Sequence, residues 1–260
     1  MRSFAIVLLV IAALSGCGKT AGSLVTFHAA GAGPVDASAG QPLVFTNGLG
    51  YSVTLTTARL HVGAVYLNRS VPTSGSQAEP CIMPGIYSGQ ETSPLDIDVL
   101  SSAPQPFPAL GEGTVDPAST GEVWLFGSQV DALVDPTVLV DVEGTATSAG
   151  VTYPFSGQVT ISSNRAVPVS DPSLPGASPL CKQRIVTPIP VDLTLAQGGT
   201  LIVRADPRIW FINVDFAQMP PDPADAARRR FLDETQGQAD IAFYAGVRST
   251  AAYTFHWQSP

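Results

Sequence analysis

Charged residues, cysteines and long apolar runs are all scarce in this chain of 260 residues. Charged residues make up only 13% of it, whereas it contains 24 Gly and 23 Pro. Long solvated helices need charged surfaces and few helix breakers, so this composition argues against a helical protein. No later segment reaches the roughly 20 apolar residues that a membrane-spanning helix needs. A β-rich chain is therefore favoured.

Basic residues are also scarce. The chain has 13 Lys and Arg against 21 Asp and Glu, which gives a formal net charge of −8. Such a surface repels phosphate backbones and anionic lipid headgroups. We therefore expect no nucleic acid partner.

The N-terminus has the pattern of an export signal. Arg2 supplies positive charge, and residues 4–14 are an apolar run of Phe, Ile, Val, Leu and Ala. This run is too short to span a bilayer, but its length is typical of a signal-peptide core. Residues 1–16 are accordingly predicted to be a signal peptide that is removed.

The residues that follow this run are Leu14-Ser15-Gly16-Cys17. They resemble the lipobox of bacterial lipoproteins, in which cleavage precedes the Cys and its sulfur receives a diacylglycerol. The resemblance implies that Cys17 is lipidated, that fatty acids such as palmitate hold the protein on the membrane, and that residues 17–23 form a tether. Gly18 in place of Asp fits sorting to the outer membrane, with the periplasmic or surface face left open. The alternative is an ordinary signal peptide with an incidental Cys.

Cys81 and Cys181 are the two remaining cysteines. In an oxidising compartment such a pair most simply forms one disulfide. Closing a loop of about 100 residues would stabilise the fold by up to roughly 4.7 kcal/mol in the chain-entropy model. Two buried thiols or a metal pair remain as alternatives.

Short apolar and β-branched runs recur between turn signals after the tether. The predicted strands are 24–28, 43–46, 51–67, 95–100, 121–126, 137–145, 152–161, 185–195, 200–204, 210–216 and 251–257. Asn47-Gly48 and Gly198-Gly199 are typical of hairpin turns. The pattern predicts one all-β domain over residues 24–260, an antiparallel β-sandwich of immunoglobulin-like or Greek-key type.

Long loops and short helices complete the expected domain. Residues 70–94, 101–120 and 164–181 are rich in Pro, Gly and Ser and are predicted to be loops. Residues 223–234 have Pro in the first turn and Ala and Arg in the body, which predicts a helix. A second helical turn is expected near 240–245.

Hydrolase chemistry finds little support in the sequence. No G-x-S-x-G elbow is present, and only His28, His61 and His256 could serve as imidazole bases. Two acid pairs share strand faces, Asp96 with Asp98 and Asp141 with Glu143, but solvated strand faces have the same pattern. We therefore predict that the protein is not an enzyme, and keep an enzyme acting on an envelope polymer as the last alternative.

Imidazole also binds copper and zinc, which makes His61 and His256 candidate metal ligands. His61 shares strand parity with Val53, Leu55, Val65 and Leu67, which predicts a semi-buried position. Alternation in the last strand places Tyr253, Phe255 and Trp257 inward and His256 outward, so the two imidazoles are expected in different environments. His256-Trp257 and the separate His61 on a long strand resemble exported copper-associated proteins of methane-oxidising bacteria, which pair His ligands with an aromatic-rich β-fold. Surface or hydrogen-bonded histidines are the favoured interpretation, and metal binding the alternative.

Two other groups could bind ligands. Trp124, Trp210 and Trp257 could stack on a sugar, although core packing explains them as well. The cluster Arg228–Arg230 could contact phosphate-bearing lipid, although a solvated helix face paired with acids explains it as well.

The mature region resembles the uncharacterised β-rich lipoproteins of Gram-negative bacteria. The sequence thus favours a non-enzymatic envelope protein with a structural or partner-binding role, held to the membrane through its N-terminal lipid and possessing no bound cofactor. A copper- or zinc-binding lipoprotein is the alternative.

Overall fold

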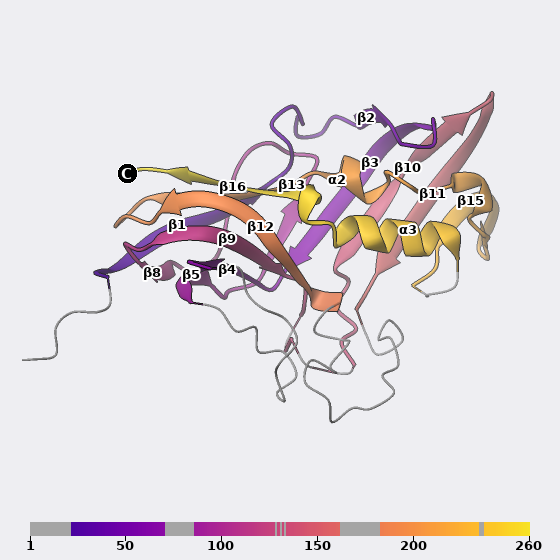
Figure 1. Cartoon of the computed structure of the whole chain (residues 1–260). Coiled ribbons are helices and arrows are strands. Elements are labelled where there is room, and N and C mark those ends of the chain that lie inside the picture. Colours follow the sequence, from indigo (N-terminus) through magenta and orange to yellow (C-terminus); the bar gives the residue numbers. More distant parts are fainter. Residues whose placement is uncertain are drawn as a thin grey trace, which may run out of the picture.

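The computed structural model describes residues 22–70, 86–127, 129, 130, 132, 134–161, 183–233 and 237–260 (Figure 1). Cys17, Cys81, Cys181 and the predicted loop at 164–181 lie outside these ranges, so the lipid site and the disulfide stay predictions. Within the described ranges, no helix is both long and apolar enough to cross a membrane.

The fold is all-β and sandwich-like, built from two sheets with short helices beside them (Figure 1). The strands are β1 (Leu24–Ala32), β2 (Leu43–Thr46), β3 (Ser52–Val62), β4 (Ala64–Asn68), β5 (Tyr87–Glu91), β6 (Leu95–Asp98), β7 (Gln105–Pro106), β8 (Gly111–Thr114), β9 (Pro117–Trp124), β10 (Val140–Ser148), β11 (Val151–Val159), β12 (Ile185–Thr194), β13 (Thr200–Ala205), β14 (Pro221–Asp222), β15 (Asp225–Phe231) and β16 (Tyr253–Gln258). The helical segments are α2 (Pro207–Trp210), η2 (Phe216–Gln218), α3 (Gln238–Val247) and η3 (Thr250–Ala252).

The nine-stranded sheet nearly closes on itself. Its order is β12-β9-β4-β5-β8-β1-β13-β16, with β7 beside β1, and its edge strands β12 and β16 lie next to each other. Phe27 and Trp257 meet inside it edge to face, with ring centroids 6.0 Å apart. Gly121 leaves room for the Phe255 ring, because a Cβ there would lie 2.8 Å from it. The predicted inward alternation of Phe255 and Trp257 is confirmed.

The seven-stranded sheet has the order β14-β15-β11-β10-β3-β2, with β6 beside β3. Helices α2, η2 and α3 pack on it through aromatic side chains, among them Phe211, Phe216 and Phe243. Gly63 alone separates β3 from β4, so the predicted strand 51–67 is in fact two strands in two sheets. One buried apolar core extends through both sheets.

Most pairings are antiparallel, as expected, but β1 with β13 and β11 with β15 are parallel. Those two exceptions make both sheets mixed. Many residues separate β1 from β13 and β11 from β15 in the sequence, and a parallel pair requires such a crossover.

The predicted helix at 223–234 is wrong, because these residues contain strand β15. Phe231 packs against Phe155 with ring centroids 6.1 Å apart, and the strand pairs with β11. The Asp222 and Asp225 carboxylates accept hydrogen bonds from the backbone of Ala224 and Ala227 and stabilise the turn that leads into it. Tertiary pairing thus overrides the small helix preference of Ala and Arg.

The predicted strand at 210–216 is also wrong. Helix α2 ends at Trp210, capped at its start by Asp206, and the chain then winds irregularly to η2. Asn47 donates hydrogen bonds to the carbonyls of Phe211 and Val214, so a side chain takes the place of a strand ladder. Trp210 and Phe211 are both fully buried, which an alternating strand with one solvated face would not allow.

Strands β5 and β8 were not predicted and lie in the expected loops 70–94 and 101–120. β5 contains Gly89, and β8 contains Gly111 and Gly113, because bulky inner side chains occupy the space beside them. A Cβ at Gly111 would lie 2.4 Å from Phe27, and one at Gly113 would lie 2.4 Å from Leu195. The sequence cue for a strand is therefore weak here. The helical turn expected near 240–245 is confirmed as part of α3.

Candidate functional sites

His61 lies on the outward side of β3, directly opposite Asp96 of β6. Its Nδ1 is 2.6 Å from Asp96 Oδ1, and its side chain is only 14% exposed whereas that of Asp96 is 80% exposed. The carboxylate favours the tautomer with the proton on Nδ1. The Nε2 atom is buried and has no hydrogen-bond partner, so its lone pair is available to a donor or a metal.

His256 lies on the outward side of β16, in the other sheet, and is exposed. Its Nε2 is 3.3 Å from the hydroxyl of Thr254 on the same strand. The structure does not bring His61 and His256 together. The predicted partial burial of His61 is confirmed, but its predicted place on the same face as Val53 and Leu55 is wrong, because Leu60 and Val62 point into the core on either side of it. Across the described ranges, no three His, Cys, Asp or Glu side chains are grouped in a way that could hold a metal ion.

The third imidazole, His28, is exposed on the same outward surface as His256. It pairs with Thr200 of β13, whereas His256 pairs with Ile202, so one strand and two register positions separate the two. Thr254 places a hydroxyl beside the imidazole of His256, but both residues are exposed on an open strand. A hydrolase would also need a group that orients the imidazole.

The two predicted acid pairs are engaged in different contacts. Asp96 contacts His61, and Asp98 accepts a hydrogen bond from the Leu100 backbone. Glu143 forms an ion pair with Arg228. These contacts fit the solvated-face interpretation.

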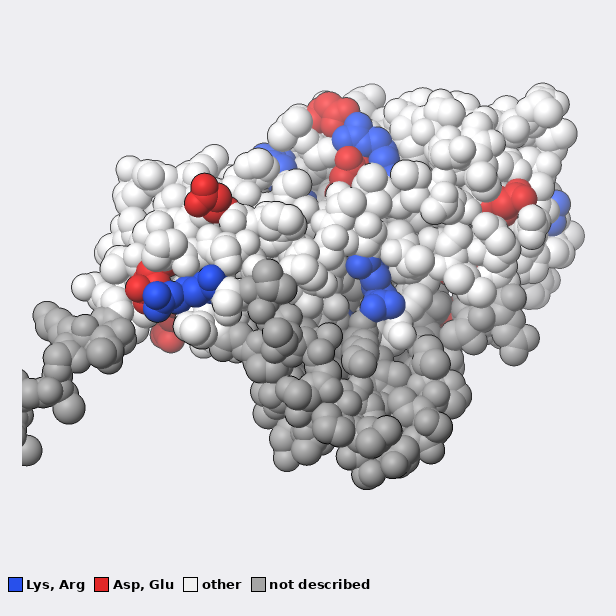
Figure 2. Space-filling view, viewed as in Figure 1, with Lys and Arg blue, Asp and Glu red and all other residues white. Residues whose placement is uncertain are grey.

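The arginine cluster lies on β15 instead of a helix. Arg228 pairs with Glu143, and Arg229 lies over the Tyr153 ring, with its guanidinium carbon 5.7 Å from the ring centroid. The partners of these two arginines therefore lie on β10 and β11. Figure 2 shows how sparse charged side chains are on the face in view.

A buried carboxylate that sequence reasoning missed lies on the outward side of the nine-stranded sheet. Glu122 is fully buried and accepts hydrogen bonds from Asn68 Nδ2 at 2.8 Å and Trp124 Nε1 at 2.7 Å. Burial raises the pKa of Glu122, although these two hydrogen bonds act in the opposite direction. Asn68 is fully buried too, and its Oδ1 has no partner.

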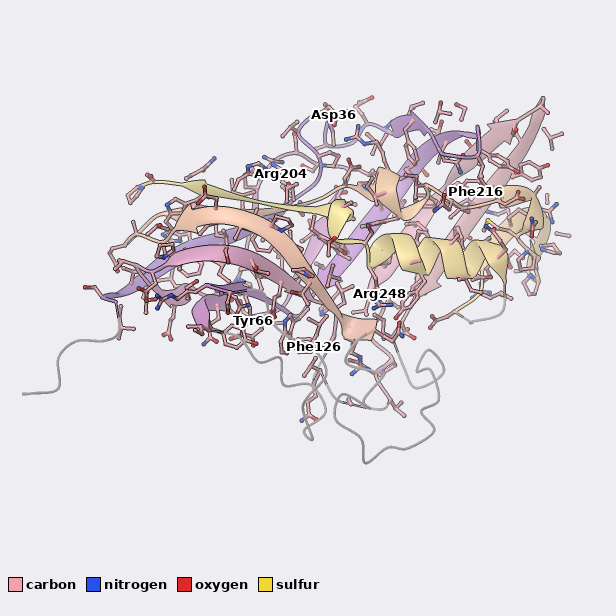
Figure 3. The ribbon with its side chains drawn as sticks, viewed as in Figure 1. Asp36, Tyr66, Phe126, Arg204, Phe216 and Arg248 are labelled. Atoms are coloured by element: carbon pink, nitrogen blue, oxygen red, sulfur yellow. The ribbon has the colours of Figure 1, made fainter. Side chains whose placement is uncertain are left out.

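Aromatic rings surround this carboxylate. Tyr66, opposite Glu122 in the ladder, has its ring centroid 4.6 Å from that of Trp124, and Trp124 is followed by Phe126. Figure 3 places Tyr66 and Phe126 on the same side of the molecule. Burial, followed by the charge of Glu122, raises the pKa of Tyr66. The only sequence signal that could have pointed to Glu122 was the alternation of side chains within the strand predicted at 121–126.

Trp124 belongs to a small outward cluster, whereas Trp210 and Trp257 pack on the main core. Because the rings of Tyr66 and Trp124 touch each other, no space for a sugar lies between them. These contacts fit the core-packing interpretation of the tryptophans.

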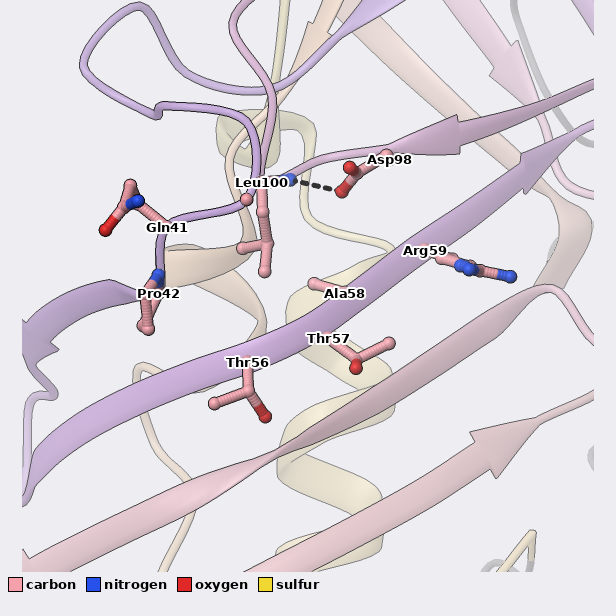
Figure 4. A pocket seen from close by; sticks show the side chains of 9 residues that line it. Gln41, Pro42, Thr56, Thr57, Ala58, Arg59, Asp98 and Leu100 are labelled. Atoms are coloured by element: carbon pink, nitrogen blue, oxygen red, sulfur yellow. Dashed lines mark hydrogen bonds between the residues drawn. The ribbon is translucent and has the colours of Figure 1, made fainter.

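A polar notch of about 300 Å³ lies on the edge of β3 between β2 and β6 (Figure 4). Its lining includes Gln41, Thr56, Thr57, Arg59 and Asp98. Arg59 is exposed. In the part of the chain that the structure describes, it has no ion-pair partner within 4.0 Å.

The comparisons with known proteins give one structural match. No family model and no curated protein matches the chain. The solved structure of MbnP from Methylosinus trichosporium is similar with a TM-score of 0.41 and 12% sequence identity, over 91% of this chain and 99% of that one.

Proposed function

We propose that this chain is an exported, lipid-anchored protein of the cell envelope with a non-enzymatic, partner-binding role. The observation that carries the proposal is the short distance in sequence between Cys17 and the fold. The described chain starts at Gly22, five positions after Cys17, and β1 starts at Leu24. A lipid on Cys17 would therefore hold one end of the nine-stranded sheet close to a bilayer.

The polar notch supports the partner-binding part of the proposal. Small-molecule pockets are mostly apolar and enclosed, whereas this notch is open and lined by hydroxyls, an amide, the Asp98 carboxylate and the guanidinium of Arg59, which has no ion-pair partner among the described residues. That chemistry suits a short polar segment of a protein partner, with a carboxylate placed against Arg59.

The anchor is tested by mass spectrometry of the mature N-terminus and by membrane fractionation. We expect a diacylglycerol-modified N-terminal Cys17 and recovery of the protein in the outer-membrane fraction. The Cys17→Ser variant should be released from membranes by the absence of the lipid. An unmodified N-terminus in the wild type, or an equal membrane recovery of the variant, would contradict the proposal.

Partner binding is tested by crosslinking in intact envelopes. Arg59→Glu should lose crosslinked products that the wild type forms, while Arg230→Glu, a charge reversal on β15 away from the notch, should keep them. Equal products from both variants would exclude the notch as the binding surface.

A second candidate function is copper or zinc binding, favoured by one observation. Asp96 holds the proton of His61 on Nδ1 and leaves a buried, unpartnered Nε2, an arrangement typical of metal-ligating histidines. One imidazole is too few ligands for tight binding, so we expect weak affinity unless a partner completes the site.

Equilibrium dialysis against copper or zinc tests this candidate, because free ion stays present and a weakly bound ion is not washed away. His61→Ala should lose metal that the wild type retains, and His28→Ala serves as the matched exposed control. His256→Ala tests the other predicted ligand. Metal binding is excluded if the wild type retains no stoichiometric metal, or if His61→Ala and His256→Ala both retain as much as it does.

A further inference from the structure

Exposed apolar side chains gather at the end of the nine-stranded sheet where the described chain begins. We call them the anchor-end rim: Leu24, Ile86, Tyr87 and Val115. Their exposed fractions are 85%, 58%, 40% and 41%, respectively. Single exposed apolar residues are common on protein surfaces, but a group at one end requires an explanation.

Backbone contacts connect this rim to the start of β1. Val115 donates a hydrogen bond to the carbonyl of Ser23, directly before Leu24. Arg69 donates to the carbonyl of Ile86, and its guanidinium lies 3.6 Å from Asp116, next to Val115. The four rim residues thus belong to neighbouring strand ends.

We infer that the anchor-end rim contacts the lipid bilayer, so that the protein stands on the membrane on this end of its nine-stranded sheet. The inference rests on the proposed lipid at Cys17. Five residues lead from Cys17 to Gly22, and even fully extended they reach at most about 18 Å. The headgroup layer alone is roughly 5–8 Å thick, so the rim cannot lie far from the hydrocarbon boundary.

Because the lipid already holds the protein on the membrane, a small apolar contact is sufficient to orient it. Fully burying one such side chain contributes about 1.5–3 kcal/mol, which is too little for four partly exposed residues to recruit a free protein. Once the lipid is inserted, contact between rim and bilayer becomes intramolecular, and its effective concentration is high.

Charge favours an apolar contact over an electrostatic one. The chain is acidic, so anionic headgroups would repel it. Next to the anchor-end rim, Arg69 and Asp116 form an ion pair and neutralise each other. We therefore expect the contact to form on zwitterionic lipid and to persist at high salt.

The test uses full-length lipidated protein in phosphatidylcholine vesicles whose acyl chains carry bromine, a short-range quencher of tryptophan fluorescence. Leu24→Trp and Val115→Trp should each lose most of the added fluorescence. Val151→Trp is the matched control, because Val151 is 50% exposed on the β10–β11 hairpin at the other end of the molecule (Figure 1). Its added fluorescence should remain.

The wild-type signal is subtracted to remove the native tryptophans, and mass spectrometry confirms the lipid on every sample. Absence of lipid on Cys17 would overturn the proposed anchor itself. With the lipid present, unquenched Leu24→Trp and Val115→Trp, or quenching equal to that of Val151→Trp, would overturn only the orientation.

Discussion

Glu122 is a buried acid whose charge no cation within the described ranges neutralises. Burial raises its pKa, so the folded protein keeps this proton to a higher pH than the unfolded chain does. The free energy of unfolding must then fall as pH rises from near 4.5, the ordinary glutamate value, through the raised pKa. Above that value, the folded state bears the full cost of a buried carboxylate.

Replacement of this acid should remove the pH dependence. Glu122→Gln keeps an acceptor for Trp124 and carries no charge, so we expect its stability to vary less between pH 4.5 and neutrality than that of the wild type. Chemical denaturation across that range measures the difference. Glu112→Gln, which changes an exposed acid on β8, is the control and should leave the slope unchanged. Parallel slopes for wild type and Glu122→Gln would contradict the argument.

Arg184 is a fully buried cation. Its side chain donates hydrogen bonds to the carbonyls of Ile161, Gln129 and Val130, and so connects three separate segments. Arg184→Met should lower the free energy of unfolding by about 3–5 kcal/mol, because the buried carbonyl of Ile161 loses its charged donors.

Urea denaturation measures this loss, and Arg59→Met provides the comparison at an exposed arginine, where a change within about 0.5 kcal/mol is expected. Equal losses of unfolding free energy in the two variants would show that the buried hydrogen bonds of Arg184 do not stabilise the fold more than an exposed arginine does.

At the residue scale, the sequence predicts which way many side chains face but not their partners. The inward Trp257 and outward His256 follow from alternation along one strand. The pairing of His61 with Asp96 does not, because it depends on the register between β3 and β6. Glu122 could not be singled out either, since its burial depends on which outward face other segments cover.

At the scale of single elements, the turn of the β10–β11 hairpin holds an alanine in a strained backbone conformation. Ala149 has φ of 49° and Gly150 has φ of 79°, both in the left-handed region that two-residue hairpin turns require. Glycine adopts this conformation freely, but alanine is disfavoured there by roughly 1–2 kcal/mol.

Ala149→Asn should therefore stabilise the protein by up to about 1 kcal/mol, since asparagine tolerates this conformation better. Gly150→Ala should destabilise it by a similar amount for the opposite reason. Thermal unfolding measures both shifts. A lower melting temperature for Ala149→Asn would show that the turn is not strained at this position.

Entire elements were predicted wherever periodicity and turn residues agree, as for β2, β12 and β13. The errors occur where tertiary contacts replace local preference. Helix-favouring Ala and Arg form β15 because β11 offers a ladder. β5 has Gly89, and β8 has Gly111 and Gly113, because large inner side chains need the space. Neither partner is visible in the local sequence.

At the scale of the whole molecule, the two sheets are connected by consecutive strands, β3 of one and β4 of the other, with a single residue between them. Gly63 lies at this junction, and a Cβ there would approach the carbonyl oxygen of Phe126 to 2.5 Å. The main core includes Leu55 of the seven-stranded sheet and Leu67 of the nine-stranded sheet. A shared core and so short a connection favour one cooperative unit, and the single domain over residues 24–260 stays a prediction.

A matched pair of core truncations tests this cooperativity. Leu55 and Leu67 are both fully buried, so each replacement by Ala should cost about 2–5 kcal/mol. If both sheets unfold together, either variant shows a single transition at a lower denaturant concentration, with circular dichroism and tryptophan fluorescence in agreement. If the sheets are separate domains, Leu55→Ala lowers one transition and leaves a second where it is in the wild type. That outcome would replace the single domain by two, with their boundary at Gly63.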